Sequence, residues 1–246
     1  HPSGPIAARN CIAAVEAAVG SDIRDGLKRE WALFEELAAS PYAQALQYAF
    51  FAERKAADIP DIGPDVKARP INATGVVGAG TMGTGISLAA MKDRPLVRHF
   101  EAVAVPGLRL AQADLERGAL DGEGALRIRE TVEGNVARGR ITADEGRARL
   151  SRLTPTLELG ALGNADLIIE AVFEKLALKK DVFARLDRVA RAGAVLASNT
   201  STLDVDQIAA ATGRPGDVVG MHFFSPANIM RLLEVVRGKA TTREAL

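Results

Sequence analysis

With 246 residues, of which 48% are hydrophobic and 25% charged, the chain has enough material for one α/β core with an appendage and is too apolar for a disordered chain. The 31 basic and 31 acidic residues cancel, and no stretch combines clustered cations with aromatic residues, so the composition argues against nucleic acid and favours a small-molecule ligand. A single cysteine argues against a disulfide or a multi-cysteine metal site and suggests the cytoplasm or an equivalent reducing compartment, while the lack of an apolar run of about 18 residues argues against a membrane span.

The amino-terminal part, residues 1–57, has a helical pattern and no strand signal. Its aromatic residues Tyr42, Tyr48, Phe50 and Phe51 are interpreted mainly as helix-packing residues, with a ligand-binding surface as the alternative. The following segment, residues 58–71, is polar and interrupted by prolines that cannot continue a helix, so we expect an extended linker and a domain boundary there.

After the linker, the pattern changes to strands that alternate with helices, which is typical of a parallel sheet covered on both faces. We predict strands at 72–77, 166–173, 194–200, 218–224 and 232–236, and helices at 81–91, 125–138, 142–153, 177–191 and 203–212. The expected fold is therefore an α/β, Rossmann-type, doubly wound and mostly parallel sheet over residues 72–240, preceded by the helical segment.

The first predicted strand leads into a glycine-rich turn, GVVGAGTMG, at residues 75–83. In a dinucleotide site of this pattern, Gly78 permits the tight turn, Gly80 lets the backbone approach a pyrophosphate, and Gly83 lets the helix pack closely on the strand. The free N–H groups at the helix N-terminus would then bind the anion. The pattern favours a dinucleotide over another nucleotide-like ligand or a purely structural turn.

Two residues compete for the role of the acid that binds the adenosine ribose. If LVRHFE is the second strand, Glu101 follows Gly80 at the spacing of about 20 residues that this motif requires. If GLRLAQAD is the strand, the acid is Asp114, and an insertion must intervene. We favour Glu101, with a solvated charge at the strand end as the alternative. In either register a carboxylate repels a 2′-phosphate, so NAD is favoured over NADP.

Four blocks, GAGTMG, ADLIIEAVFE, LASNTSTL and MHFFSPANIMRLLEVV, occur in this order along the chain. Together they resemble the NAD-binding domain of L-3-hydroxyacyl-CoA dehydrogenase, as it occurs in the multifunctional fatty-acid β-oxidation enzymes, over residues 70–240. Residues 1–57 are similar to the end of the enoyl-CoA hydratase half that precedes the dehydrogenase in those fusions. Residues 241–246 would then begin the family's helical carboxyl-terminal domain.

The resemblance implies roles for individual residues. His222 matches the catalytic base that takes the proton of the 3-hydroxyl group, Glu234 matches its partner carboxylate, and Ser201 matches a substrate-binding serine. The positions that match NAD contacts of the family are Gly78, Gly80, Met82, Gly83, Glu101, Val172, Glu174, Lys179, Asn199 and Ser225. Glu170, inside an apolar strand, is interpreted as a structural residue rather than the catalytic acid.

The implied activity is NAD-dependent oxidation of a (3S)-3-hydroxyacyl-CoA to the 3-oxoacyl-CoA in fatty-acid β-oxidation. The implied partners are the acyl-CoA substrate and, through regions outside this sequence, a thiolase subunit or further copies of the chain. The alternative is a truncated, non-catalytic NAD-binding or structural module. A further alternative, a β-hydroxyacid-type dehydrogenase with a lysine base, is disfavoured because the MHFFSP block contains no lysine. The segment 93–124 departs most from the family's pattern.

Overall fold

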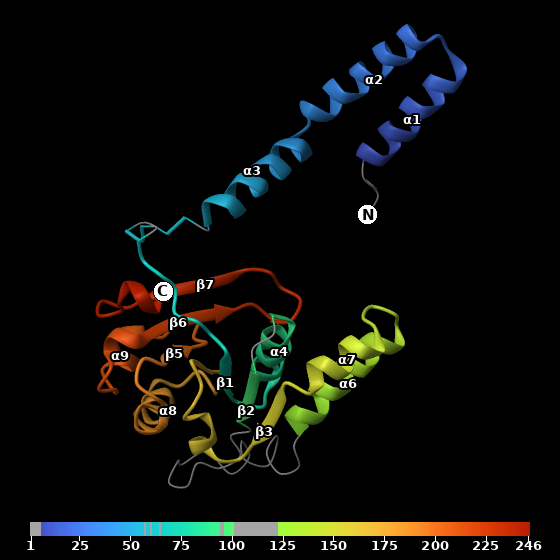
Figure 1. Cartoon of the computed structure of the whole chain (residues 1–246). Helices are drawn as coiled ribbons and strands as arrows, with labels where there is room; N and C mark the ends of the chain where they lie inside the picture. Colours follow the sequence, from blue (N-terminus) through green and yellow to red (C-terminus); the bar gives the residue numbers. More distant parts are fainter. Residues whose placement is uncertain (1–5, 57, 60, 64, 94–95, 101–122) are drawn as a thin grey trace. The chain divides into compact units, whose positions relative to one another are not determined.

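The computed structural model describes residues 6–56, 58–59, 61–63, 65–93, 96–100 and 123–246. The chain divides into two compact units, His1–Gly63 and Pro64–Leu246, and the division falls inside the segment 58–71. The first unit contains helices, and the second contains a sheet with helices on both faces (Figure 1).

The first unit consists of the helices α1 (Ile6–Gly20), α2 (Ile23–Ala38) and α3 (Pro41–Ala56). Asp22 caps α2, because its side chain accepts a hydrogen bond from the backbone N–H of Arg24 at 2.6 Å. The side-chain amide of Asn10 on α1 donates to the carbonyl of Leu33 on α2 at 3.1 Å, and Leu33 is buried between them. The contact between α1 and α2 therefore combines a buried apolar residue with a side-chain hydrogen bond.

The aromatic residues of α3 are half-exposed or more, although they were interpreted as packing residues. Phe50 contacts only its neighbour Phe51 edge-on among the aromatic rings, and the guanidinium of Arg54 lies 4.3 Å above the Phe50 ring. Helix packing within the described part of this unit therefore does not cover the aromatic face, and that interpretation is wrong for these side chains.

The second unit is organised around a seven-stranded sheet with the order β3-β2-β1-β4-β5-β6-β7. Neighbouring strands are parallel except β7, which runs antiparallel to β6. This order begins as the 3-2-1-4-5-6 order of a dinucleotide-binding fold. The strands are β1 (Ala73–Val77), β2 (Leu96–Phe100), β3 (Leu153–Thr156), β4 (Leu167–Glu170), β5 (Val195–Ser198), β6 (Val218–Phe223) and β7 (Leu233–Arg237).

Helices cover both faces of the sheet. Successive residues of a strand point to opposite faces, so each strand contributes side chains to both helical layers. On β4, Ile168 packs in the cluster with α8 (Leu176–Val189) and α9 (Val205–Ala209), whereas Ile169 packs in the cluster with α4 (Thr81–Ala90) and α6 (Glu123–Ala137). Figure 1 shows the two layers on either side of the strands. The predicted α/β, doubly wound, mostly parallel fold is confirmed.

One strand was not predicted. The expected helix at 142–153 ends early, as α7 (Ala143–Leu150), and the chain then forms the edge strand β3 with the sequence LTPT. The strand has four residues and contains Pro155, which is typical of an edge position and weakens the strand signal. Short 3-10 helices occupy Met91–Asp93, Leu159–Leu162, Pro215–Asp217 and Arg243–Ala245.

Candidate cofactor and catalytic site

The glycine turn after β1 has the tight geometry that its spacing predicts. Gly78 has a φ of +123°, and a Cβ at this position would lie 2.6 Å from the carbonyl oxygen of Ala171. A Cβ at Gly83 would lie 1.9 Å from the carbonyl oxygen of Gly78. Glycine is therefore required at both positions, at the first by its backbone conformation and at both by the close approach of the chain to itself.

Gly80 has a different part in this turn. It is the N-cap of α4, and among the described residues no side chain caps the helix there and no atom would lie within 4 Å of a Cβ at this position. Open space therefore lies next to an uncapped helix N-terminus, where backbone N–H groups and the helix dipole favour an anion. These features fit the pyrophosphate of a dinucleotide.

The ribose acid cannot be placed in the same way. The strand β2 pairs in parallel with β1, from Ala73 opposite Leu96 to Val77 opposite Phe100, as the register that favours Glu101 requires. Both Glu101 and Asp114 lie outside the described residues. The choice between them stays a prediction.

A buried cluster of charges lies where β4 ends. Glu170 shares the sheet face of Ile168, since the two are two residues apart, and α8 covers this face. Lys179 belongs to the buried stripe of α8, and its Nζ lies 2.9 Å and 3.1 Å from the two carboxylate oxygens of Glu170. Both side chains are 0% exposed, and the hydroxyl of Ser198 donates to the same carboxylate at 2.7 Å. The buried charges are therefore paired and hydrogen-bonded.

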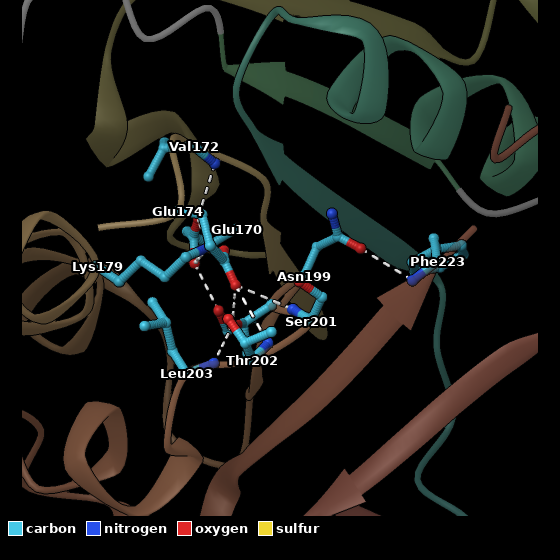
Figure 2. Close-up of polar contacts among 11 residues, drawn as sticks. Glu170, Val172, Glu174, Lys179, Asn199, Ser201, Thr202, Leu203 and Phe223 are labelled. Atoms are coloured by element: carbon cyan, nitrogen blue, oxygen red, sulfur yellow. Dashed lines mark hydrogen bonds and ion pairs between the residues drawn. The ribbon is translucent and has the colours of Figure 1, made fainter. Parts of the chain in front are cut away.

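Glu174 connects this cluster to the loop after β5. The Nζ of Lys179 lies 3.2 Å from Oε2 of Glu174, while Oε1 accepts hydrogen bonds from the hydroxyl of Thr200 and from the backbone N–H groups of Ser201, at 3.0 Å, and Thr202, at 3.4 Å (Figure 2). Burial raises the pKa of Glu174, but the hydrogen bond from Thr200, the charge of Lys179 and the N–H of Ser201 outweigh it and leave the pKa below its usual range. The carboxylate therefore remains ionised and holds the loop.

Asn199 links that loop to the next strand. Its side-chain oxygen accepts a hydrogen bond from the backbone N–H of Phe223 on β6 at 2.9 Å, as Figure 2 shows. Its own backbone N–H donates to the carbonyl of Glu170 at 2.7 Å. The ends of β4, β5 and β6 are thus tied together at one edge of the sheet, where open α/β sheets bind their ligands.

His222 and Glu234 form a cross-strand pair between β6 and β7. They lie directly opposite each other in the antiparallel register, and Nδ1 of His222 is 2.8 Å from Oε2 of Glu234. The side chain of His222 is 22% exposed and that of Glu234 is 54% exposed. The ring of Phe224 lies 4.6 Å from the imidazole, centroid to centroid. With Nδ1 engaged by the carboxylate, Nε2 is the nitrogen left for proton transfer.

The remaining predicted residues lie around the same edge. Met82 and Val172 are partly buried against the two core clusters, and Ser201 and Ser225 are exposed. The sequence prediction did not include the hydroxyls of Ser198 and Thr200 or the backbone N–H of Phe223. The polar run SNTST after an apolar strand was a usable signal for the hydroxyls, whereas a backbone N–H leaves no signal in the sequence.

Comparison with known proteins decides the family. The family model described as "3-hydroxyacyl-CoA dehydrogenase, NAD binding domain" matches residues 73–246, more than half of the chain. The chain belongs to this family. The resemblance stated from the sequence is therefore confirmed, and NAD is the cofactor of the 3-hydroxyacyl-CoA dehydrogenase domain.

Curated relatives cover nearly the whole chain. It is 42% identical over 241 residues to the peroxisomal bifunctional enzyme of Homo sapiens, and 34% identical over 238 residues to the peroxisomal fatty acid beta-oxidation multifunctional protein of Oryza sativa subsp. japonica. Each match covers 96% of this chain but 31% of the relative. The 3-hydroxyacyl-CoA dehydrogenase domain and its helical segment therefore span about a third of these relatives.

Solved structures support the same assignment. The 3-hydroxybutyryl-CoA dehydrogenase of Escherichia coli is 35% identical, with a TM-score of 0.62, over 72% of this chain and 34% of that one. The dehydrogenase part of the C. elegans multifunctional enzyme 1 is 26% identical, with a TM-score of 0.61, over 76% of this chain and 40% of that one. Both are similar to the 3-hydroxyacyl-CoA dehydrogenase domain in fold and in sequence.

The expectation of a cytoplasmic protein is wrong. The human and rice relatives are named as peroxisomal, and a relative from Cucumis sativus is named as glyoxysomal. A low cysteine content shows only that a protein does not depend on disulfides, and it does not distinguish one disulfide-poor compartment from another. Among the described residues, no helix is long and apolar enough to cross a membrane.

Proposed function

We propose that the dehydrogenase domain oxidises a (3S)-3-hydroxyacyl-CoA to the 3-oxoacyl-CoA, with NAD as the hydride acceptor. The observation that carries this proposal is the His222–Glu234 pair, at 2.8 Å, at the ligand-binding edge of a dinucleotide-binding sheet. The family match and the sequences of the multifunctional β-oxidation relatives support it.

In the proposed reaction, Nε2 of His222 takes the proton from the 3-hydroxyl group. Bound NAD supplies the acceptor at its nicotinamide for the hydride that leaves C3, and the C3–O bond becomes a carbonyl. Glu234, on Nδ1, fixes the tautomer that leaves Nε2 free and stabilises the imidazolium that results. Ser201, exposed on the loop after β5, is proposed to donate a hydrogen bond to the substrate oxygen.

The cofactor is proposed to lie along the carboxyl edge of the sheet. Its pyrophosphate would bind at the glycine turn, its adenosine ribose at Glu101 or Asp114, and its nicotinamide half beside Asn199. We propose that the cofactor site is completed by Gly78, Gly80, Met82, Gly83, Val172, Glu174 and Ser225. Lys179 is proposed at the same site, where it would support Glu174, because it is fully buried and paired with Glu170 and Glu174.

The partners follow from the same proposal. The substrate is an acyl-CoA, and a thiolase subunit or further copies of the chain are the proposed protein partners, through regions outside this sequence. A second candidate function is NAD binding without turnover. It is favoured by four apolar residues in the connection between β6 and β7 and on β7, because they stay exposed within the described residues: Ile229, Met230, Leu232 and Val235.

Two assays on the full chain test the proposal. NADH binding is followed by fluorescence, and acetoacetyl-CoA reduction is followed by the loss of nicotinamide absorbance. Saturable binding with turnover is the expected result. Saturable binding without turnover would favour the non-catalytic module, and absence of binding would contradict both candidate functions.

The cofactor site has its own test in Gly80→Ala. The added Cβ meets no atom of the described residues within 4 Å and Gly80 has a φ of −74°, so the fold is expected to tolerate the change. The methyl group would occupy space next to the helix N-terminus, and NADH affinity is expected to fall by about tenfold, which corresponds to about 1.4 kcal/mol. Gly160→Ala, which also meets no atom within 4 Å, is the matched control. Equal NADH affinity in both variants would contradict the placement of the pyrophosphate at this turn.

A further inference from the structure

The side chain of Asn199 has a fixed orientation. The atom facing it on β6 is the backbone N–H of Phe223, which can only donate, so the side-chain oxygen must face Phe223 and the NH₂ group must point away. Figure 2 shows the side chain reaching from the loop after β5 to β6 in this way. Within the described part of the chain, the side-chain oxygen of Asn199 is therefore engaged with the protein, and its NH₂ group is free for another contact.

This hydrogen bond continues the sheet beyond the point where its ladder ends. The pairing of β5 with β6 runs from Leu196 opposite Val218 to Ser198 opposite Gly220, and β6 then extends through His222 without a facing residue of β5. The carbonyl of Asn199 supplies the next acceptor on that edge. On its other edge, β6 pairs with β7, where His222 faces Glu234. The backbone around His222 is thus held from both sides.

Asn199 is itself held firmly. Its backbone N–H donates to the carbonyl of Glu170, whose carboxylate is fully buried with Lys179. The next three residues of the loop donate to Glu174, which is paired with the same lysine. A buried ion-pair cluster therefore fixes the loop from which Asn199 reaches the strand of His222.

We infer that Asn199 is a positioning residue for His222, acting through its side-chain carbonyl on the backbone N–H of Phe223. This inference rests on the proposed function, in which His222 is the catalytic base. Loss of the hydrogen bond frees one edge of β6 and lets the imidazole move relative to Glu234 and to the substrate. Small misplacements of a catalytic group reduce the rate strongly.

The test compares three variants of the full chain. Asn199→Ala removes the acceptor, and Asn199→Asp keeps an oxygen that can accept from Phe223 but loses the NH₂ donor. Asn135→Ala, on α6 and away from this edge, is the matched control. We expect kcat at saturating NADH to fall by about tenfold or more in Asn199→Ala. Asn199→Asp is expected to recover most of the loss. Both Asn199 variants lack the NH₂ group that faces the proposed nicotinamide site, so any change in the dissociation constant of NADH is expected to be the same in both.

A second readout does not depend on turnover. The ¹⁵N chemical shifts of the His222 ring report its tautomer, and His222→Ala identifies its signals among the 3 histidines of the chain. At a pH at which the ring is neutral, we expect protonated Nδ1 in the wild type and in Asn199→Asp, and a mixture of tautomers in Asn199→Ala. This arm separates the inference from the proposed function, because it remains decisive if the wild type does not reduce acetoacetyl-CoA.

Three results would overturn the inference. In the first, the ring signals and, where the wild type turns over, kcat are unchanged in Asn199→Ala. In the second, Asn199→Asp fails as severely as Asn199→Ala. In the third, Asn199→Ala and Asn199→Asp weaken NADH binding by the same factor by which they lower kcat/KM. The whole effect would then come from the lost NH₂ group at the cofactor.

Discussion

Two side-chain pairs in the dehydrogenase domain, a lysine–carboxylate ion pair and a histidine–carboxylate hydrogen bond, have nearly equal lengths and opposite surroundings. The Nζ of Lys179 lies 2.9 Å from Glu170 with both side chains 0% exposed, whereas Nδ1 of His222 lies 2.8 Å from Glu234 with side chains that are 22% and 54% exposed. The buried lysine contacts two carboxylates, and one of these also binds Ser198. The His222–Glu234 pair lies on the last two strands of the sheet.

The difference teaches which interactions shape the site and which are available for chemistry. Charges taken out of water are costly unless every partner is present, so the buried cluster has one favourable arrangement and fixes the ends of β4, β5 and α8. A partly exposed histidine with one carboxylate partner can exchange its proton with a ligand. In the dehydrogenase domain, the buried Lys179 cluster thus holds the loop after β5, and the separate His222–Glu234 pair is proposed to transfer the proton.

The largest expected effect is that of Lys179→Met on the buried ion pair. This substitution leaves Glu170 buried without its counter-charge, and we expect the free energy of unfolding to fall by about 3–5 kcal/mol. Denaturation by urea measures the loss. Lys180→Met, at the next and partly exposed position of α8, is the control and is expected to change stability by no more than about 0.5 kcal/mol.

The double variant Glu170→Gln with Lys179→Met completes this test. It removes both charges of the buried pair, so it should regain part of the stability lost in the single variant. A single variant as stable as the wild type would show that the cluster does not hold the structure. If the double variant loses more unfolding free energy than Lys179→Met and Glu170→Gln lose together as single variants, the assigned ion pair is contradicted.

A smaller effect is expected from acid. The folded-state pKa of Glu174 lies below its ordinary value of 4.5, so the folded protein binds fewer protons at this site than the unfolded chain does. Its stabilising contribution is present above the ordinary value and is lost as the pH falls through the lowered one. Other carboxylates contribute equally to the wild type and to Glu174→Gln. We therefore expect the stability gap between these proteins to shrink between about pH 6 and pH 3. A constant gap would exclude the ionised Glu174 as a tie for the loop.

The sequence was sufficient for the parts of the fold that follow from periodicity and glycine spacing. The strands at Leu167–Glu170 and Val195–Ser198 are apolar up to one final polar residue, Ala73–Val77 has Thr74 as its one polar residue, and the turn at Gly78 requires glycine. The edge strand β3 was missed because four residues with a proline, covered on one edge only, carry little apolar signal. The exposure of the α3 aromatics was missed because a helical period shows that a face exists without showing what covers it.

The site was predictable where the family blocks contain the residues, and less so where tertiary contacts decide. His222 and Glu234 lie twelve positions apart, and the antiparallel pairing of β6 with β7 brings them together. The burial of Lys179 follows from its place on the apolar stripe of α8, a pattern that the sequence contains, whereas its role at the cofactor stays a prediction. The bond from Phe223 to Asn199 involves a backbone group, which any residue except proline provides.

The most direct test of the account is the rate of acetoacetyl-CoA reduction by His222→Ala at saturating NADH, beside the wild type. If His222 is the acid–base group, the rate should fall by about 100-fold or more, with NADH affinity and unfolding free energy close to those of the wild type. The His222 side chain is 22% exposed and no hydrophobic core residue is removed, so its truncation is not expected to unfold the domain. A variant that reduces acetoacetyl-CoA at the wild-type rate would contradict the central claim that the exposed pair carries the chemistry.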